Sequence, residues 1–259
     1  MSFGNPLETL ANPVGVFLSG GIDSSAITAF AGKRLGAKLS TYSVQFDYDK
    51  GVNELPQAAK VANHFGTDHH EFKIGGYDVA DTVVKMVHHN DHPFSDAANI
   101  PLYLLCEQVK DKTKVILQGD GGDELFAGYQ RYNTLARLSW MRVASRIGGF
   151  VNRAIPKNAA YYARQRYINA LQSRPDFKLM AALLTVEDKM YPPTSVFDKE
   201  FRARVEQHEH DERYSDVEKQ YQDQDIVNRM LLVDKQIILP DIFLEKVDRA
   251  TMAASVEVR

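Results

Sequence analysis

The sequence predicts an α/β protein, a doubly wound parallel sheet followed by a helical C-terminal part. Short apolar or β-branched runs alternate with helix-like stretches in the first half of the chain, and this alternation is typical of a parallel sheet covered on both faces. Beyond about Tyr132 the strand signals fade and helical patterns take over. Two glycine-rich loops each follow a strand candidate, where ligands bind in open parallel sheets.

Four strands and four helices account for the expected sheet and its cover. The strands are short and apolar or rich in β-branched residues, at residues 14–18, 39–46, 69–74 and 114–118. Between them lie helix-like stretches at residues 23–33, 54–65, 77–89 and 101–110, and a polar loop is expected at 47–51. This order predicts strand, loop and helix in succession.

The expected domain organisation is an N-terminal tail at residues 1–12, an α/β core at 13–134 and a helical part at 135–259. Helical patterns in the last part lie at residues 135–147, 161–171, 177–184 and 224–239. The stretch 206–218 is dense in charge and histidine, which predicts a solvated surface loop.

Composition indicates an ordinary mildly acidic protein, because 31 Lys and Arg against 34 Asp and Glu give the 259 residues a net charge of −3. A strongly basic nucleic-acid binder is thereby disfavoured. The single cysteine, Cys106, excludes an intrachain disulfide framework, a four-cysteine zinc site and an iron–sulfur cluster. It lies in an apolar helical run, which predicts a buried thiol. No apolar window of about 20 residues and no signal-peptide pattern occurs, so we expect a cytoplasmic protein with no membrane partner.

The first glycine loop, SGGIDSS at residues 19–25, has the composition of a phosphate cradle. Gly20 and Gly21 let the backbone approach an anion closely, and the amides at the start of the following helix add donors. Further donors are the hydroxyls of Ser19, Ser24 and Ser25. Asp23 would repel a phosphate unless a cation lay between them, so the loop also indicates Mg²⁺. The alternative is a tight turn in which Ser and Asp only cap the helix.

The second glycine loop, QGDGGDE at residues 118–124, follows the last strand candidate. Its three carboxylates, those of Asp120, Asp123 and Glu124, need a cation or a proton among them. Two such loops at adjacent strand ends can hold one metal–pyrophosphate, and we expect Asp23 and Asp123 on exposed loop ends. A calcium loop or a plain turn is the alternative, although the ligand spacing of an EF-hand is absent.

Three strings, LSGGIDSS, LQGDGGDELFAGYQRY and FLEKVDRATMAASVEVR, resemble the synthetase domain of glutamine-dependent asparagine synthetases and their amidotransferase relatives. They follow the family's order and span residues 14–259. SGGxDS alone is shared with many N-type ATP pyrophosphatases, and the other two strings narrow the match. The resemblance implies the adenine nucleotide alpha hydrolase-like fold of those pyrophosphatases.

The resemblance also implies a set of site residues. The ATP pyrophosphate would be held by Ser19, Gly20, Gly21, Asp23 and Ser24. Positions that contact adenosine in the family correspond to Phe17, Val44, Gln118 and Gly119. Asp23 and Asp123 would bind Mg²⁺, and Asp120 would take the catalytic position of a carboxylate important for forming the adenylate, which is often Glu in the family. The roles of two further groups are left open. A polar wall of the site or ordinary aromatic packing would explain Tyr129, Arg131 and Tyr132. A place in the substrate pocket or a helix-anchoring ion pair would explain Asp248 and Arg249.

The activity implied by the resemblance is ATP-dependent amide formation. A carboxylate, by default aspartate, is adenylated with release of pyrophosphate, and ammonia then displaces AMP to give asparagine. Alternatives are another carboxylate such as a sugar acid or secondary metabolite, ring closure of the β-lactam kind, or a nucleotide-binding module without turnover. The implied partners are the carboxylate, ammonia and a glutaminase domain or subunit outside this chain; a homodimer is left open.

The chain departs from the family's complete enzymes at both ends. Those enzymes open with a glutaminase domain whose nucleophile is a cysteine directly after the initiator methionine, whereas this chain begins Met1-Ser2 and reaches the first glycine loop by residue 19. They also continue beyond the Glu-Val-Arg motif to a lysine that stabilises the adenylation transition state. We therefore expect a fragment or a gene shortened at both ends.

Overall fold

The computed structural model describes residues 14–35, 39–47, 53–75, 79–92, 94, 96, 98–152, 156–157, 159–172, 176–184, 197–206 and 212–259. The expected tail at residues 1–12 and most of the expected loop at 47–51 lie outside these residues. The chain divides into two compact units. The sheet unit comprises the chain up to Gly122 together with Pro240–Arg259, and the helical unit comprises Asp123–Leu239.

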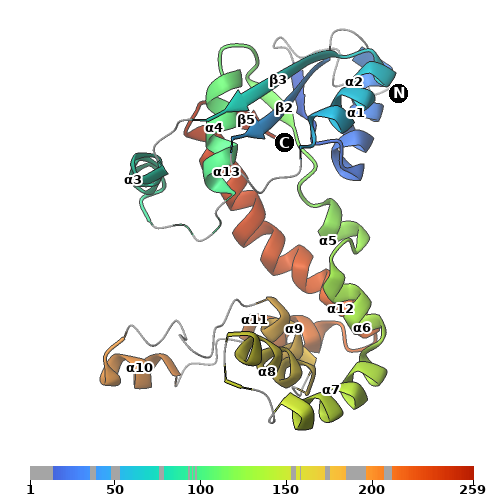
Figure 1. The fold of residues 1–259 in the computed structure, drawn as a ribbon, viewed down its shortest axis with the longest axis vertical. Helices are drawn as coiled ribbons and strands as arrows, with labels where there is room; N and C mark the ends of the chain where they lie inside the picture. Colours follow the sequence, from blue (N-terminus) through green and yellow to red (C-terminus); the bar gives the residue numbers. More distant parts are fainter. Residues whose placement is uncertain are drawn as a thin grey trace. The chain divides into compact units, whose positions relative to one another are not determined.

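The sheet unit is built on a five-stranded sheet in the order β3-β2-β1-β4-β5, and every neighbouring pair of strands is parallel (Figure 1). The strands are β1 (Val14–Phe17), β2 (Ser40–Phe46), β3 (Asp68–Ile74), β4 (Val115–Leu117) and β5 (Glu257–Val258). The register places Phe17 opposite Tyr42 and Val16 opposite Leu117. The carboxyl ends of β1 and β4 therefore lie next to each other at the centre of the sheet.

Helices pack on both faces of this sheet, which confirms the doubly wound α/β fold predicted from the sequence. The helices of the unit are α1 (Ile22–Leu35), α2 (Leu55–Phe65), α3 (Val79–Asn90), α4 (Asn99–Val109) and α13 (Glu245–Met252). Successive residues of a strand point to opposite faces. Accordingly, Val16 packs with Ala31 of α1, while Phe17 packs in the cluster that holds Cys106 of α4 and Ala250 of α13.

One strand was not expected, because residues beyond Tyr132 were predicted to be helical. β5 pairs with β4 through the Arg259 amide, which donates to the carbonyl of Ile116, and through the Gln118 amide, which donates to the carbonyl of Arg259. A strand of two residues is too short to show a period-two pattern, so its pairing with β4 is what defines it.

The helical unit contains α6 (Gln130–Ala136), α7 (Leu138–Asn152), α8 (Ala159–Gln172), α9 (Asp176–Leu184), α10 (Lys199–Glu206), α11 (Glu212–Gln220) and α12 (Ile226–Val233). Two elements cross the unit boundary, α5 (Gly122–Phe126) and the π-helix η3 (Asp234–Leu244), which contains Pro240. The predicted helix at 224–239 therefore corresponds to α12 and part of η3. No helix in the described part of the chain is long and apolar enough to cross a bilayer.

The expectation of a surface loop at 206–218 is wrong from Glu212 onward, where α11 forms. Val217 is the buried residue of this otherwise polar helix, so its sequence shows no apolar stripe from which a helix could be predicted. Tertiary contacts hold it instead, because Glu218 accepts hydrogen bonds from Arg229 of α12 and from the amide of Phe177 in α9.

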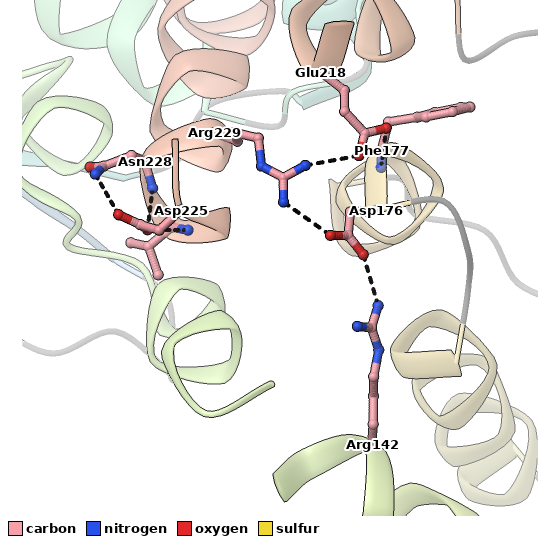
Figure 2. A network of polar contacts seen from close by, with 8 residues as sticks. Arg142, Asp176, Phe177, Glu218, Asp225, Asn228 and Arg229 are labelled. Atoms are coloured by element: carbon pink, nitrogen blue, oxygen red, sulfur yellow. Dashed lines mark hydrogen bonds and ion pairs between the residues drawn. The ribbon is translucent and has the colours of Figure 1, made fainter. Parts of the chain in front are cut away.

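A chain of charged side chains ties four helices of the helical unit together (Figure 2). One carboxylate oxygen of Asp176 in α9 forms an ion pair with Arg142 of α7 at 3.1 Å. The other oxygen forms an ion pair with Arg229 of α12 at 3.0 Å. The second branch of the Arg229 guanidinium reaches Glu218 of α11 at 2.9 Å. Burial by itself raises the pKa of Asp176, but the two guanidinium groups outweigh it and hold that pKa below its ordinary value.

Candidate active site

The first glycine loop joins β1 to α1 and is closed on itself by two serine hydroxyls. Ser19 Oγ lies 3.0 Å from Ser24 Oγ and accepts a hydrogen bond from the Gly21 amide at 3.2 Å. The Ser19 amide donates to Ser24 Oγ at 3.3 Å, and Ser24 Oγ donates to the carbonyl of Gly21 at 3.3 Å. Ser24 is buried, so its contacts in this structure hold the shape of the loop.

Glycine is required at position 20 by both conformation and space. Gly20 has a φ of 82°, in the left-handed region, and a Cβ there would lie 2.8 Å from the side chain of Gln57 and 2.9 Å from the amide of Ala58. The next helix begins at Ile22, whose 87 % exposure leaves the N-terminus of α1 open to solvent. The loop therefore places a glycine turn and an accessible helix N-terminus at the end of β1, an arrangement that favours anions.

The two glycine loops are in contact through Asp23. A Cβ on Gly119 would lie 3.0 Å from Cβ of Asp23, and a Cβ on Gly122 would lie 2.4 Å from its carboxyl carbon. The second loop is itself tightly turned, because the Gly122 amide donates to the carbonyl of Gly119 and Gly121 has a φ of 97°. The expected convergence of the loops is thus present in the sheet unit.

Asp23 and Asp123 do not lie on exposed loop ends, as was expected. Each is half-buried and belongs to the first turn of a helix, α1 and α5 respectively, because the strand-to-helix turns are short. Asp123 is the first residue of the helical unit. Its carboxylate lies against Gly128, where a Cβ would come within 1.7 Å of one carboxylate oxygen.

Of the positions predicted to contact adenosine, Phe17 ends β1, Gln118 and Gly119 follow β4, and Val44 lies within β2. Phe17 is 8 % exposed and packs in the same cluster as Val44, which is paired with Phe72 in the sheet. The Phe17 ring is therefore a core side chain. The side-chain oxygen of Gln118, next to Gly119, is buried and has no hydrogen-bond partner within the described part of the chain.

Asp120 pairs with a lysine that the sequence analysis did not single out. Lys246 Nζ of α13 lies 3.6 Å from Asp120 and 3.5 Å from Asp96, and its side chain is only 10 % exposed. One largely covered lysine side chain therefore lies between two carboxylates from separate segments. Lys246 lies within the third string, and this position is the one feature of the sequence that could have marked it as a site residue. Its pairing with two carboxylates was not visible in the sequence.

A pocket of about 180 Å³ adjoins this ion pair within the sheet unit. Its polar lining includes Asn90, Asp96, Asn99, Asp241, Glu245 and Lys246. Arg249, one of the residues left open by the sequence, also lines the pocket, and it donates to Glu245 and to the carbonyl of Asn90 at 2.8 Å each. Arg249 thus both faces the pocket and anchors α13 to the end of α3.

In the helical unit the other open group forms a buried polar cluster around Asp234. Arg131 donates to Asp234 at 2.7 Å, and the hydroxyl of Tyr132 donates to the same oxygen. The Arg131 guanidinium also lies 3.9 Å above the ring of Tyr129, whose hydroxyl donates to Glu124. Burial raises the pKa of Asp234 despite these hydrogen bonds. The sequence analysis missed Asp234, because a lone acid in an apolar helical run gives no sign of its partners.

Cys106 lies in α4 and is fully buried, as predicted. Burial raises the pKa of its thiol to about 12. The thiol is therefore protonated at neutral pH and inaccessible, which makes it a core side chain and not a nucleophile.

The sequence model described as asparagine synthase matches residues 10–259 of this chain. The chain belongs to the asparagine synthase family. It is 31% identical over 252 residues to asparagine synthetase [glutamine-hydrolyzing] 1 of Bacillus subtilis, covering 95% of this chain and 38% of that protein. A putative asparagine synthetase [glutamine-hydrolyzing] of Mycobacterium bovis is 29% identical, covering 95% of this chain and 37% of that one.

This asparagine synthase family chain thus spans less than two fifths of the length of these two relatives. Among solved structures, an NH3-dependent NAD synthetase from Campylobacter jejuni covers 65% of this chain and 91% of that one, at 12% identity and a TM-score of 0.32. The fold class rests on the parallel sheet itself, and the family on the sequence match.

Proposed function

We propose that the sheet unit binds ATP through the two glycine loops and, with the rest of the chain, adenylates a carboxylate that ammonia then converts to an amide. The observation that carries this proposal is the contact of Asp23 with Gly119 and Gly122. It joins two loops at the carboxyl ends of the neighbouring parallel strands β1 and β4, where ligands bind in open α/β sheets.

The pyrophosphate part of ATP would lie at the first loop. Gly20 allows the chain to turn there without a side chain, and the open N-terminus of α1 supplies amide donors and a positive dipole end. Ser19 and Gly21 would contact the anion, and the buried Ser24 would keep the loop in shape. Attack of the substrate carboxylate on the α-phosphorus would release pyrophosphate into this cradle.

The residues present fit a magnesium ion, because a carboxylate lies among glycines whose missing Cβ atoms leave it room. Asp23 and Asp123 would hold the ion, since hard divalent cations prefer carboxylate and phosphate oxygens. Mg²⁺ would offset the negative charge of pyrophosphate as it leaves. The adenosine would lie near Phe17, Val44, Gln118 and Gly119.

Asp120 would act beside the α-phosphate, held by Lys246. The proposed carboxylate is aspartate and the product asparagine, because the two relatives reported above are named asparagine synthetases. Their names also say that they hydrolyse glutamine. We therefore propose that ammonia reaches this chain from solution or from a glutaminase domain or subunit.

The test is release of pyrophosphate from ATP in the presence of Mg²⁺, aspartate and ammonium chloride, with asparagine and AMP measured in parallel. The expected result is stoichiometric formation of the three products. Asp23→Asn and Asp123→Asn are each expected to lower both Mg-ATP affinity and turnover at least tenfold, whereas the exposed Asp216→Asn serves as the matched control. ATP binding without pyrophosphate release for aspartate, or for a panel of other carboxylates, would contradict the proposal.

A further inference from the structure

The turn between α5 and α6 brings Gly128 directly onto Asp123, the second of the two proposed magnesium ligands. The Gly128 amide donates to the Asp123 carbonyl at 3.1 Å, and a Cβ on Gly128 would lie 1.7 Å from one carboxylate oxygen of Asp123. The carboxylate therefore rests against the backbone of residue 128. The position of that backbone decides the position of the carboxylate.

The conformational preferences of this segment do not hold the turn in place. Ala127 has a φ of 58°, in the left-handed region that a side chain disfavours. The helix before it, α5, has five residues, far fewer than a helix needs to be stable by itself. Contacts from outside the turn must therefore keep Gly128 where it is.

A series of side-chain contacts within the helical unit supplies this support. The hydroxyl of Tyr129 donates to the carboxylate of Glu124, which is 2 % exposed and directly follows Asp123. The Arg131 guanidinium lies 3.9 Å from the centre of the Tyr129 ring and donates to the fully buried Asp234 at 2.7 Å. Tyr129 is thus held at two places, its hydroxyl by Glu124 and its ring by Arg131.

We propose that Tyr129 and Arg131 are positioning residues for Asp123, holding its carboxylate where it binds the magnesium ion of Mg-ATP. The inference rests on the proposed function, in which Asp123 binds that ion. Tyr129 acts through Glu124 and the backbone of the turn, and Arg131 acts through the ring of Tyr129. The alternative is that the cluster only anchors α6 to η3. In that case metal–nucleotide binding is unaffected as long as the chain stays folded.

Calorimetric titration of the full chain separates the two roles without any turnover. The probe is the Mg²⁺ complex of an ATP analogue in which a methylene group replaces the oxygen between the α- and β-phosphorus atoms. Tyr129→Phe removes one hydroxyl and leaves the buried Glu124 without that donor. This change is expected to lower the affinity at least fivefold. Tyr167→Phe is the matched control, because its hydroxyl makes an exposed contact of 3.1 Å with Thr134; its affinity should stay within twofold of wild type.

A double variant tests whether Tyr129 acts through Asp123. If it does, Tyr129→Phe combined with Asp123→Asn binds the probe within twofold of Asp123→Asn alone, because the carboxylate to be positioned is already gone. A purely structural loss would instead add in full to that of Asp123→Asn. Arg131→Met is also expected to lower the affinity at least fivefold, and Arg131→Lys should restore part of it, since the charge beside Asp234 returns.

Far-UV circular dichroism and urea unfolding report whether each variant is folded. A folded Tyr129→Phe chain with undiminished affinity, or losses that add in full in the double variant, would overturn the positioning role. Undiminished affinity in Asp123→Asn would instead overturn the metal assignment of the proposed function, and this inference with it.

Discussion

The carboxylate of Asp23 occupies the space that a side chain on Gly122 would need, since a Cβ there would come within 2.7 Å of both carboxylate oxygens. Asp23 follows β1 and Gly122 follows β4, so the contact joins the ends of the two neighbouring strands. Asp23 of the first loop can therefore take this position only because residue 122 of the second loop is a glycine.

Gly122→Ala is expected to displace Asp23 and weaken Mg-ATP binding at least tenfold, about 1.4 kcal/mol. Gly148→Ala is the control, because a Cβ there would meet Ile168 at an ordinary 3.8 Å. Titration calorimetry with Mg-ATP measures both. Unchanged affinity in Gly122→Ala would mean that Asp23 does not contribute to nucleotide binding.

Lys246→Met is expected to lower the rate of pyrophosphate release at least tenfold while Mg-ATP affinity stays within about twofold. The reason is that Asp120 and Asp96 lose the ammonium group between them, whereas the pyrophosphate loop is untouched. Lys246→Arg should restore part of the rate, because the positive charge returns. Steady-state kinetics separate kcat from KM, and equal rates in wild type and Lys246→Met would exclude a role for this pair.

This chain by itself is not expected to use glutamine as an ammonia donor. Its single cysteine, Cys106, is buried in α4, and burial raises the pKa of the thiol to about 12. A pKa raised this far keeps the thiol protonated at pH 7 to 9. A thiol reagent should therefore react with Cys106 only after the chain is unfolded, and no glutamate should form from glutamine; detection of either reaction in the folded chain contradicts this prediction.

Asp176→Asn is expected to destabilise the helical unit by on the order of 3 kcal/mol at pH 7, because Arg142 loses its carboxylate partner and Arg229 keeps only Glu218. The pKa of Asp176 is lowered from about 3.8 in the folded chain, so its contribution is present above that value and lost as the pH falls through the folded pKa. Fluorescence of Trp140, the single tryptophan, follows unfolding in urea.

For this prediction the control is Asp216→Asn, whose carboxylate pairs on the surface with Lys219. That change should cost less than about 1 kcal/mol. The difference between wild type and Asp176→Asn should shrink at acidic pH below the folded pKa. A difference that is independent of pH would show that the carboxylate charge does not stabilise the unit.

Local sequence was sufficient for the elements whose pattern lies within a few neighbouring residues. Strands could be predicted from the apolar run at β1 and the β-branched run at β2, and tight turns from the glycine strings after β1 and β4. Each is recognisable because a buried strand and a tight turn restrict which residues can occupy them. The fold class and the family follow from these stretches. Burial of Cys106 also follows, since its neighbours in the helix are apolar.

Pairings between distant segments could not be obtained in this way. The two-residue strand β5 exists through its hydrogen bonds to β4, and α11 is held by Glu218 in a helix that has no apolar stripe. In the sequence Lys246 and Asp234 look like ordinary surface residues, but in the fold Asp234 is fully buried and the Lys246 side chain is only 10 % exposed. A charge is stable there only when chain folding brings it a partner, so the identity of that partner is a property of the assembled structure.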